Sequence, residues 1–135
     1  MLEVAAAIIS NEQNQLLIAR RKKGKSQEGL WEFPGGKIEQ GESAESCLRR
    51  ELLEEMRIEI APQQWFGVNE HYYGAAPIRL IAYKASYISG EIILVDHDDY
   101  RWVSPRELKD YSFAPADIKF VELLELEQSL EIDGK

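Results

Sequence analysis

One stretch of this sequence carries apolar residues at every fourth position, and this repeat limits what the rest of the chain can form. Ala44, Leu48, Leu52 and Met56 fall on one face of a helix, and Ser43 before them is a residue type that caps helix starts. We therefore predict a helix from about Ser43 to Met56. A helix with a single apolar stripe is stable only when that stripe packs on another layer, which the rest of the chain must supply.

The sequence on both sides of this helix is typical of strands. Leu2 to Ile9 and Gln15 to Ala19 are apolar runs joined by a polar turn, which predicts a hairpin. Further strands are predicted at Phe66–Tyr73, Ile78–Ile88, Glu91–Val95 and Tyr100–Val103. A last helix begins near Pro115 and carries Ile118, Val121, Leu123, Leu124 and Leu126. This order predicts an α/β (α+β) chain in a single domain, residues 1–135, with a mixed β-sheet sandwiched between α-helices.

The composition fits one globular domain. The chain has 135 residues, of which 44% are hydrophobic and 30% charged. Its single cysteine, Cys47, excludes an intramolecular disulfide and fits a reducing compartment. Glu3 interrupts the first apolar stretch, no basic region precedes it, and no apolar run approaches the roughly 18 residues of a membrane span. We therefore expect a cytoplasmic protein that does not bind a membrane.

The formal net charge of −8 argues against binding to a nucleic-acid polymer, which favours basic proteins. Small phosphate-containing substrates are not excluded, because a cluster of carboxylates can bind a metal that then meets the phosphates. Arg20 to Lys25 is a basic run in this acidic chain, and it fits either a solvated loop or a site that steers phosphates. The sequence leaves both a monomer and a homodimer open.

Glu51, Glu54 and Glu55 form an acidic cluster on the predicted helix, because residues three and four apart share a face. Acids this close repel one another. Arg50 could pair with Glu54, and a divalent cation would neutralise the cluster more fully. Taken alone, the three glutamates are more typical of a solvated acidic face.

The residues before the helix change that interpretation. Gly36 is followed by five residues and Glu42, then by seven residues and the string Arg50-Glu51-Leu52-Leu53-Glu54-Glu55, and Ile58 closes the pattern. This spacing resembles the Nudix box, the signature of the Nudix hydrolase superfamily. The resemblance implies a Nudix fold and a metal-dependent hydrolase.

Two further features bear on this resemblance. Trp31 to Lys37, just before the box, is similar to the MutT-type branch of the family. Arg57 stands where the signature has glycine, and it is the one fixed position that differs. A glycine after a helix commonly adopts a left-handed conformation, which would cost an arginine about 1 kcal/mol. The helix therefore either takes this strained exit or ends differently.

The resemblance implies a Mg²⁺ site, for which Mn²⁺ could substitute. It makes Glu54 and Glu55 the main metal ligands and Glu51 a further ligand or the group that orients the attacking water. The backbone carbonyl of Gly36 or of Gly35 would add another ligand.

The residues around these ligands are also assigned by the resemblance. Arg50 would hold the glutamates in place by charge-assisted hydrogen bonds, and Glu42 would support them from outside the metal shell. Family members often add one acid from a loop outside the box, and Asp96, six residues before Trp102, is the candidate. A polar turn is the alternative for Asp96, and His97 beside it is interpreted as structural.

Four residues are candidates for binding the substrate. Asp117, after the turn Ala114-Pro115-Ala116, stands where MutT-like enzymes hydrogen-bond the base, although it could instead cap the last helix or complement its dipole. Phe33 could stack on the base or present its backbone. Arg21 resembles a family arginine near the phosphates, and Arg79 could face the same cleft from a strand.

These residues predict hydrolysis of a (deoxy)nucleoside triphosphate to the monophosphate and pyrophosphate. The substrate could be an oxidised nucleotide such as 8-oxo-dGTP. One alternative is an enzyme that acts on cytidine nucleotides. Another is a catalytically silent Nudix fold that senses nucleotides, although such proteins usually lose the glutamates that this chain keeps.

Overall fold

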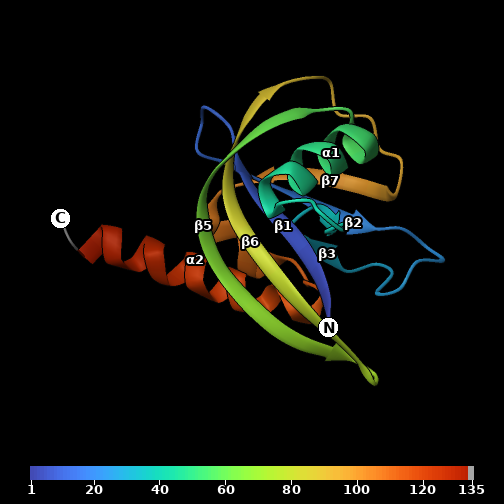
Figure 1. The fold of residues 1–135 in the computed structure, drawn as a ribbon. Coiled ribbons are helices and arrows are strands. Elements are labelled where there is room, and N and C mark those ends of the chain that lie inside the picture. Colours follow the sequence, from blue (N-terminus) through green and yellow to red (C-terminus); the bar gives the residue numbers. More distant parts are fainter. Residues whose placement is uncertain (134–135) are drawn as a thin grey trace.

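The computed structural model describes residues 1–133, which form one sheet with a helix on each face (Figure 1). The strands are β1 (Leu2–Ser10), β2 (Leu16–Arg21), β3 (Trp31–Glu32), β4 (Gly35–Lys37), β5 (Glu59–Tyr73), β6 (Ala76–Ser89) and β7 (His97–Val103). The helices are α1 (Ala44–Met56), the short 3₁₀ helix η1 (Pro105–Asp110) and α2 (Pro115–Asp133). The predicted fold class, a mixed sheet between helices, is confirmed.

β1 lies at the centre of the sheet, and its pairing with β6 makes the sheet mixed. The strands run in the order β3-β2-β1-β6-β5, with β4 paired to β1 and β7 paired to β2. The β1–β6 pair is parallel, whereas the other pairs are antiparallel, including the predicted hairpin of β1 and β2. The parallel pair brings Leu2 beside Ile78, so the first residues of both strands meet at one end of the sheet.

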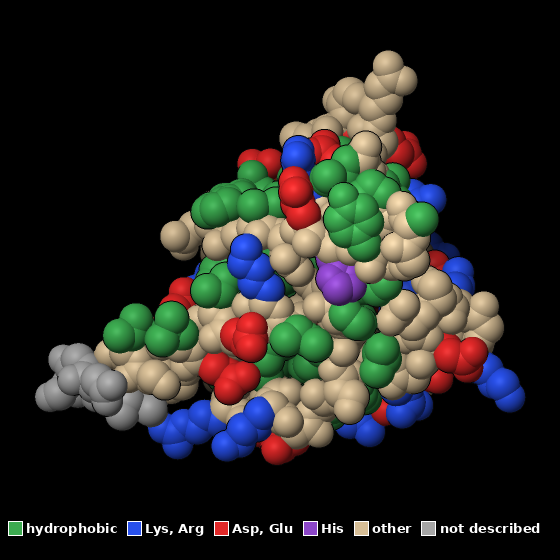
Figure 2. Space-filling view, turned by 90° about the horizontal axis from the view of Figure 1, so that it is seen from below, with side chains coloured by type: hydrophobic (Ala, Val, Ile, Leu, Met, Phe, Trp, Pro, Cys, Tyr) green, Lys and Arg blue, Asp and Glu red, His purple; other side chains and the backbone are tan. Residues whose placement is uncertain are grey.

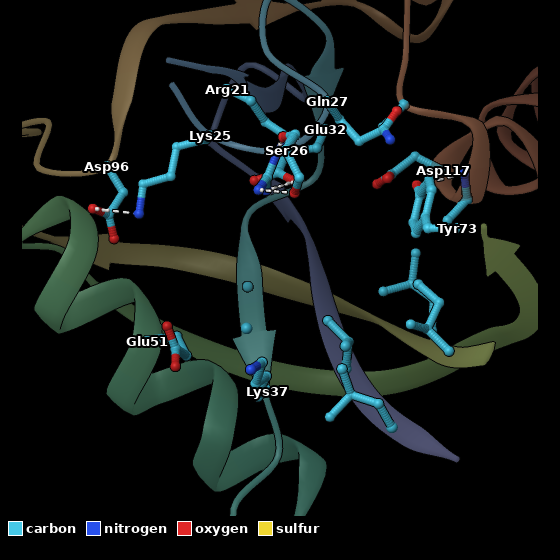
Figure 3. Close-up of a pocket in the computed structure, with 18 of the residues that line it drawn as sticks. Arg21, Lys25, Ser26, Gln27, Glu32, Lys37, Glu51, Tyr73, Asp96 and Asp117 are labelled. Carbon is cyan, nitrogen blue, oxygen red and sulfur yellow. Dashed lines mark hydrogen bonds and ion pairs between the residues drawn. The ribbon is translucent and has the colours of Figure 1, made fainter. Parts of the chain in front are cut away.

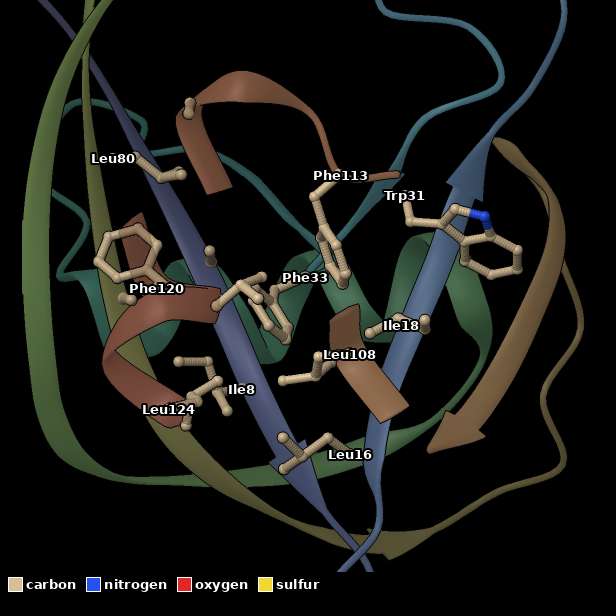
Figure 4. Close-up of a cluster of buried hydrophobic side chains, with 14 of the residues drawn as sticks. Ile8, Leu16, Ile18, Trp31, Phe33, Leu80, Leu108, Phe113, Phe120 and Leu124 are labelled. Atoms are coloured by element: carbon tan, nitrogen blue, oxygen red, sulfur yellow. The ribbon is translucent and has the colours of Figure 1, made fainter. Parts of the chain in front are cut away.

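Alternate residues of β1 face two separate apolar cores, because successive side chains of a strand point to opposite faces. Ala5, Ala7 and Ile9 belong to the core that α1 covers. Ala6 and Ile8 belong to the core that α2 covers, which also contains most of the buried aromatic rings (Figure 4). Burial on both faces explains why the sequence of β1 is almost continuously apolar.

α1 matches the helix predicted from about Ser43 to Met56. The hydroxyl of Ser43 accepts a hydrogen bond from the backbone N–H of Ser46 at 3.1 Å, which confirms the predicted cap. Leu48, Leu52 and Met56 are buried against the sheet. Glu51 and Glu55 are half-buried beside this stripe, whereas Glu54 is exposed on the far side of the helix.

Arg57 takes the left-handed conformation that the signature reserves for glycine, with φ 60° and ψ 30°. The backbone N–H groups of Arg57 and Ile58 return to the carbonyls of Leu53 at 3.2 Å and Leu52 at 3.3 Å. These bonds close the last turn of α1. The helix therefore ends as it would with glycine, and the arginine adopts a strained backbone conformation.

The strand predicted at Glu91–Val95 is wrong. The N–H of Ile93 donates to the carbonyl of Met56 at 3.1 Å, and the N–H of Val95 donates to the carbonyl of Glu55 at 3.2 Å. Carbonyls in the last turn of a helix have no partner within the helix. This segment supplies those partners, so its backbone binds α1 instead of joining the sheet.

Two strands are longer than predicted. β5 begins at Glu59 instead of Phe66, and it passes Pro62 through register shifts against β6. Such bulges accommodate a proline, which has no N–H for the ladder. β7 begins at His97 instead of Tyr100, so residues 97–99 also belong to the sheet.

α2 begins at Pro115, as predicted, but only part of its apolar sequence is buried. Val121 and Leu124 are buried, whereas Ile118 and Leu126 are exposed. The C-terminal half of α2 extends past the sheet (Figure 1), and apolar side chains stand among charged ones of both signs on the face seen from below (Figure 2). Within residues 1–133 no helix, α2 included, is long and apolar enough to cross a membrane.

Candidate active site

A cavity of about 580 Å³ opens between α1, the start of β1 and the start of α2 (Figure 3). Acidic side chains of α1 and of the segment before β7 line one end, and residues near the start of α2 line the other. The loop between β2 and β3 lies between these ends and contributes basic and polar side chains. The cavity has the size of a small-molecule site and offers acidic, basic and apolar surfaces to one ligand.

The acidic end holds Glu51 and Glu55 of α1 together with Asp96. Burial, followed by the charges of Glu51 and Asp96, raises the pKa of Glu55 to about 9. Carboxyl groups this crowded do not all ionise near neutral pH without a cation. The arrangement therefore carries an electrostatic cost that a bound divalent cation would remove.

The donor atoms at this end fit a hard divalent cation. Carboxylate oxygens are the ligands that Mg²⁺ and Mn²⁺ prefer, and Glu51, Glu55 and Asp96 supply them on one cavity wall. Within the described chain, residues 1–133, no three acidic, histidine or cysteine side chains already converge closely enough to enclose an ion. The three side chains would therefore have to turn toward one another to coordinate a metal.

Two glycines allow the acidic end to form. A Cβ added to Gly36 would overlap the carboxyl group of Glu51, and one added to Gly35 would overlap the backbone carbonyl of Ala5. β4 can therefore lie between β1 and the glutamate only because both residues lack a side chain. The carbonyl of Gly36, a predicted metal ligand, accepts a hydrogen bond from the thiol of Cys47 at 3.5 Å.

Arg50 joins the glutamates of the box in one network. Its guanidinium donates to both carboxylate oxygens of Glu42, at 2.7 and 2.9 Å, and to Oε1 of Glu51 at 2.9 Å. The hydrogen bonds from Arg50 lower the pKa of Glu42 to about 2. Glu54 lies 3.4 Å from Arg50, its side chain is 61% exposed, and it does not line the cavity. Arg50 therefore fixes Glu51, whereas Glu54 stands outside the cavity wall.

The other end of the cavity is built around Asp117, in the first turn of α2. Asp117 is 5% exposed, and its Oδ1 accepts a hydrogen bond from the backbone N–H of Phe33 at 3.1 Å. Burial raises the pKa of Asp117 well above its ordinary value. The donor of this hydrogen bond lies in the segment between β3 and β4 and is not an N–H group of α2. Helix capping therefore does not explain the position of the carboxyl group.

Phe33 does not offer its ring to a ligand, contrary to one of the predictions made for it. The ring is buried and lies 5.4 Å from the ring of Phe113, centroid to centroid, in the α2-side core. Its backbone N–H is occupied by Asp117. The aromatic side chain that lines this end is Tyr73, whose hydroxyl accepts a hydrogen bond from the N–H of Ala116 at 3.2 Å.

Arg21, Glu32 and His97 connect the two ends of the cavity. Glu32 accepts a hydrogen bond from Arg21 at 3.0 Å through Oε1, and its Oε2 lies 2.8 Å from Nε2 of His97. The family resemblance predicted that Arg21 lies near the phosphates, but Glu32 was not among the predicted site residues. The signal was present in the alternation of the strand, because buried Trp31 and Phe33 belong to one core and the residue between them must face the other side.

Arg79 lies outside this cavity, which corrects its prediction as a substrate-binding residue. Its guanidinium donates to Glu70 at 2.9 and 3.0 Å and to Glu3 at 3.3 Å. Ile78 and Leu80 line the cavity. Because side chains alternate along a strand, the residue between these two points to the opposite face of the sheet.

Comparison with known proteins agrees with this geometry. Residues 2–124 match the NUDIX domain family. The chain is 38% identical over 122 residues to a CTP pyrophosphohydrolase of Escherichia coli, covering 90% of each protein. It is 32% identical over 124 residues to an 8-oxo-dGTP diphosphatase of Haemophilus influenzae, covering 92% of this chain and 91% of that one. A MutT protein from Methanosarcina mazei superposes with a TM-score of 0.83 at 27% identity, covering 94% of both chains. The chain belongs to the Nudix hydrolase family.

Proposed function

We propose that this chain hydrolyses a (deoxy)nucleoside triphosphate to the monophosphate and pyrophosphate, with Mg²⁺ as its cation and Mn²⁺ as a substitute. The observation that carries the proposal is a single cavity with Glu51, Glu55 and Asp96 at one end and Asp117 at the other. A triphosphate held at the acidic end would place its base beside Asp117. The relatives named as a CTP pyrophosphohydrolase and an 8-oxo-dGTP diphosphatase support this reaction.

The acidic end supplies the reacting groups in this proposal. Glu51, Glu55 and Asp96 would hold the cation, and the hydrogen bond from Arg50 orients Glu51. The cation would supply the acidity that activates a water and the positive charge that offsets the leaving phosphate. Glu51 then serves either as a ligand or as the group that orients the attacking water. The reaction breaks the P–O bond between the α- and β-phosphates. The oxygen of the attacking water ends on the monophosphate if the α-phosphorus is attacked and on pyrophosphate if the β-phosphorus is attacked.

Arg21 is placed to meet the phosphates between the two ends. Its guanidinium is held by Glu32 at 3.0 Å and by the backbone carbonyl and hydroxyl of Ser26 at 2.5 and 3.2 Å. These contacts fix the orientation of the planar group before a ligand arrives. A guanidinium oriented in this way can bind phosphate oxygens without losing further side-chain entropy.

Asp117 is proposed to hold the base. Its Oδ1 already accepts the N–H of Phe33, so Oδ2 is the oxygen left for a ligand. Burial favours the neutral acid, which can donate as well as accept a hydrogen bond. Cytosine and 8-oxoguanine both present acceptor atoms to such a donor.

The leading substrate in this proposal is 8-oxo-dGTP, whose removal would protect the nucleotide pool. The second candidate is a cytidine nucleotide. It is favoured by the identity to the CTP pyrophosphohydrolase of Escherichia coli, 38% over 122 residues, against 35% over 117 residues for the 8-oxo-dGTP diphosphatase of the same organism.

A pyrophosphate-release screen over ordinary and oxidised nucleoside triphosphates tests the function. Turnover should require Mg²⁺ or Mn²⁺, stop when the metal is chelated, and yield the monophosphate. The ratio of kcat/KM for 8-oxo-dGTP and CTP then decides between the two bases. Nucleotide binding in calorimetry without turnover in either metal would contradict the hydrolase and support the nucleotide sensor.

The position of each glutamate predicts different losses of activity. Glu55→Gln should lower kcat by more than the roughly 10- to 100-fold typical of a change outside the metal shell, because it removes a charged ligand from the cavity wall. Glu54→Gln should cost less, since this side chain is 61% exposed and stands outside the wall. Equal losses in the two variants, with unchanged circular dichroism, would contradict the assignment of Glu55.

A further inference from the structure

The loop between β2 and β3 carries a lysine into the acidic end of the cavity. Nζ of Lys25 lies 3.5 Å from Oδ1 of Asp96, and both residues line the cavity together with Glu51 and Glu55 (Figure 3). The side chains of Lys25 and Asp96 are 45% and 38% exposed, so water reaches the pair. A positive charge therefore stands where three carboxyl groups crowd together.

The backbone of this loop fixes where the lysine points. The N–H of Lys25 donates to the carbonyl of Lys22 at 3.2 Å. The ammonium of Lys22 in turn donates to the carbonyl of Val95 at 3.1 Å, directly before the acid that Lys25 meets. Gly24 has φ +94°, a conformation that favours glycine in a tight turn. The turn and the anchor together hold Lys25 beside the carboxylates.

The ion pair of Lys25 competes with a metal for the same acid. Asp96 cannot pair fully with the ammonium of Lys25 and with a divalent cation at the same time. The ammonium and the cation would also repel each other, because both would lie within a few ångströms of the same carboxylate. Because the pair is exposed, it is weak enough to exchange partners. The phosphates of a nucleotide would attract the displaced ammonium, which sits on a flexible four-carbon stem.

We propose that Lys25 is an exchangeable counter-ion of the acidic end. In the free protein it pairs with Asp96 and weakens the binding of a bare divalent cation. When a metal-bound triphosphate enters, Lys25 leaves Asp96 and binds the phosphates. Metal and nucleotide therefore bind better together than separately. This inference rests on the proposed function, because it takes the acidic end as the metal site, and it makes Lys25 a substrate-binding residue.

The substitution Lys25→Met tests the exchange, because it removes the charge and keeps an apolar side chain at an exposed position. Mn²⁺ alone, measured by electron paramagnetic resonance, should bind about twofold to fivefold more tightly, which is the range for an exposed ion pair. The complex of Mg²⁺ with tripolyphosphate, measured by calorimetry, should bind about threefold or more weakly, because a charge-assisted hydrogen bond is lost. Opposite signs in these two measurements are the signature of an exchanged partner.

Lys23→Met is the matched control, since Lys23 lies on the same loop, is exposed, and makes no ion pair with the part of the chain that the structure describes. It removes the same charge and should leave both affinities unchanged. Lys25→Arg should retain both wild-type values within about twofold. Changes of the same sign for Lys25→Met, or changes equal to those of Lys23→Met, would overturn the proposal.

Glu55→Gln separates this inference from the function on which it rests. If the wild-type protein binds Mn²⁺ no better than Glu55→Gln, the metal site fails and the role of Lys25 fails with it. If Glu55→Gln loses Mn²⁺ while Lys25→Met matches the wild type, the metal site stands and only the counter-ion is refuted.

Discussion

Asp117 is a buried carboxyl group whose protonation bears on the stability of the folded chain. Its carboxyl group is 5% exposed, and its hydrogen bond comes from a backbone N–H and not from a cation. The charge of Glu32 adds to the effect of burial and further disfavours the ionised form. A group of this kind lets the folded chain hold a proton that the unfolded chain has already released.

The substitution Asp117→Asn should therefore change how stability depends on pH. Because the folded-state pKa is raised, the folded wild type binds more protons than the unfolded chain above pH 3.8, and its stability falls as pH rises toward the folded pKa. Asparagine keeps an acceptor for the Phe33 N–H and has no charge to suppress. The free energy of unfolding of Asp117→Asn minus that of the wild type should increase from pH 5 to pH 9 in urea titrations.

Asp110→Asn provides the comparison, because Asp110 is exposed at the end of η1. Its stability difference from the wild type should stay nearly constant over the same range. A flat difference for Asp117→Asn as well would show that the proton is not held in the folded state.

The sequence predicted the place of a residue in the cavity when the spacing of the box determined it. It did not do so when the place depended on the direction in which a side chain points. Glu51 and Glu55 follow from the box and line the cavity. Phe33 and Arg79 were assigned by type, yet strand alternation turns the ring into the core and the guanidinium to another face. Lys25 could not be placed, because its position depends on a turn that meets a segment some seventy residues later along the chain.

At the scale of elements, the exit of α1 combines a correct helix end with an unfavourable residue. Arg57 has φ 60°, and its side chain is exposed, so its own contacts do not compensate for the left-handed backbone. The conformation persists because the closing hydrogen bonds and the next strand require it. Gly90 packs closely here, since a Cβ on it would lie 2.6 Å from the carbonyl oxygen of Arg57.

The substitution Arg57→Gly should stabilise the protein. A non-glycine residue in this conformation costs about 1 kcal/mol or more, and glycine removes that cost. Urea denaturation should show a gain of about 1 kcal/mol in the free energy of unfolding, with an unchanged slope. Arg57→Ala keeps the Cβ and removes the rest of the side chain, so it should show no such gain. Equal gains in the two variants would assign the effect to the side chain beyond the Cβ and contradict the backbone explanation.

The elements themselves were largely visible in the sequence, with one informative failure. Helix α1 and its cap follow from a four-residue repeat and Ser43. The segment Glu91–Val95 is rich in branched apolar residues, as strands are, but the N–H groups of Ile93 and Val95 donate to carbonyls in the last turn of α1. The local residue pattern predicts which segments are extended, but it does not predict which neighbouring segment accepts their hydrogen bonds.

At the scale of the whole molecule, the cavity depends on pairings that no local pattern contains. The parallel pair of β1 and β6 joins distant segments, and it brings Leu2 and Ile78 together at the end of the sheet that carries the cavity. The fold class was predictable because layers must cover apolar faces. The strand order was not, since several orders of these strands would bury the same residues.

The segment before Asp96 is held on α1 by main-chain hydrogen bonds from the N–H groups of Ile93 and Val95 and by the side chains of Ile92 and Leu94, which pack against the core that α1 covers. The side chains of Ile93 and Val95 are 57% and 43% exposed and add little to this attachment. Asp96 therefore sits a fixed number of peptide units from the last turn of the helix that carries Glu55. Inserting or deleting one residue here would move the acid out of reach. Selection on this spacer should therefore act on its length, and on its composition only at the two apolar residues that pack on the core.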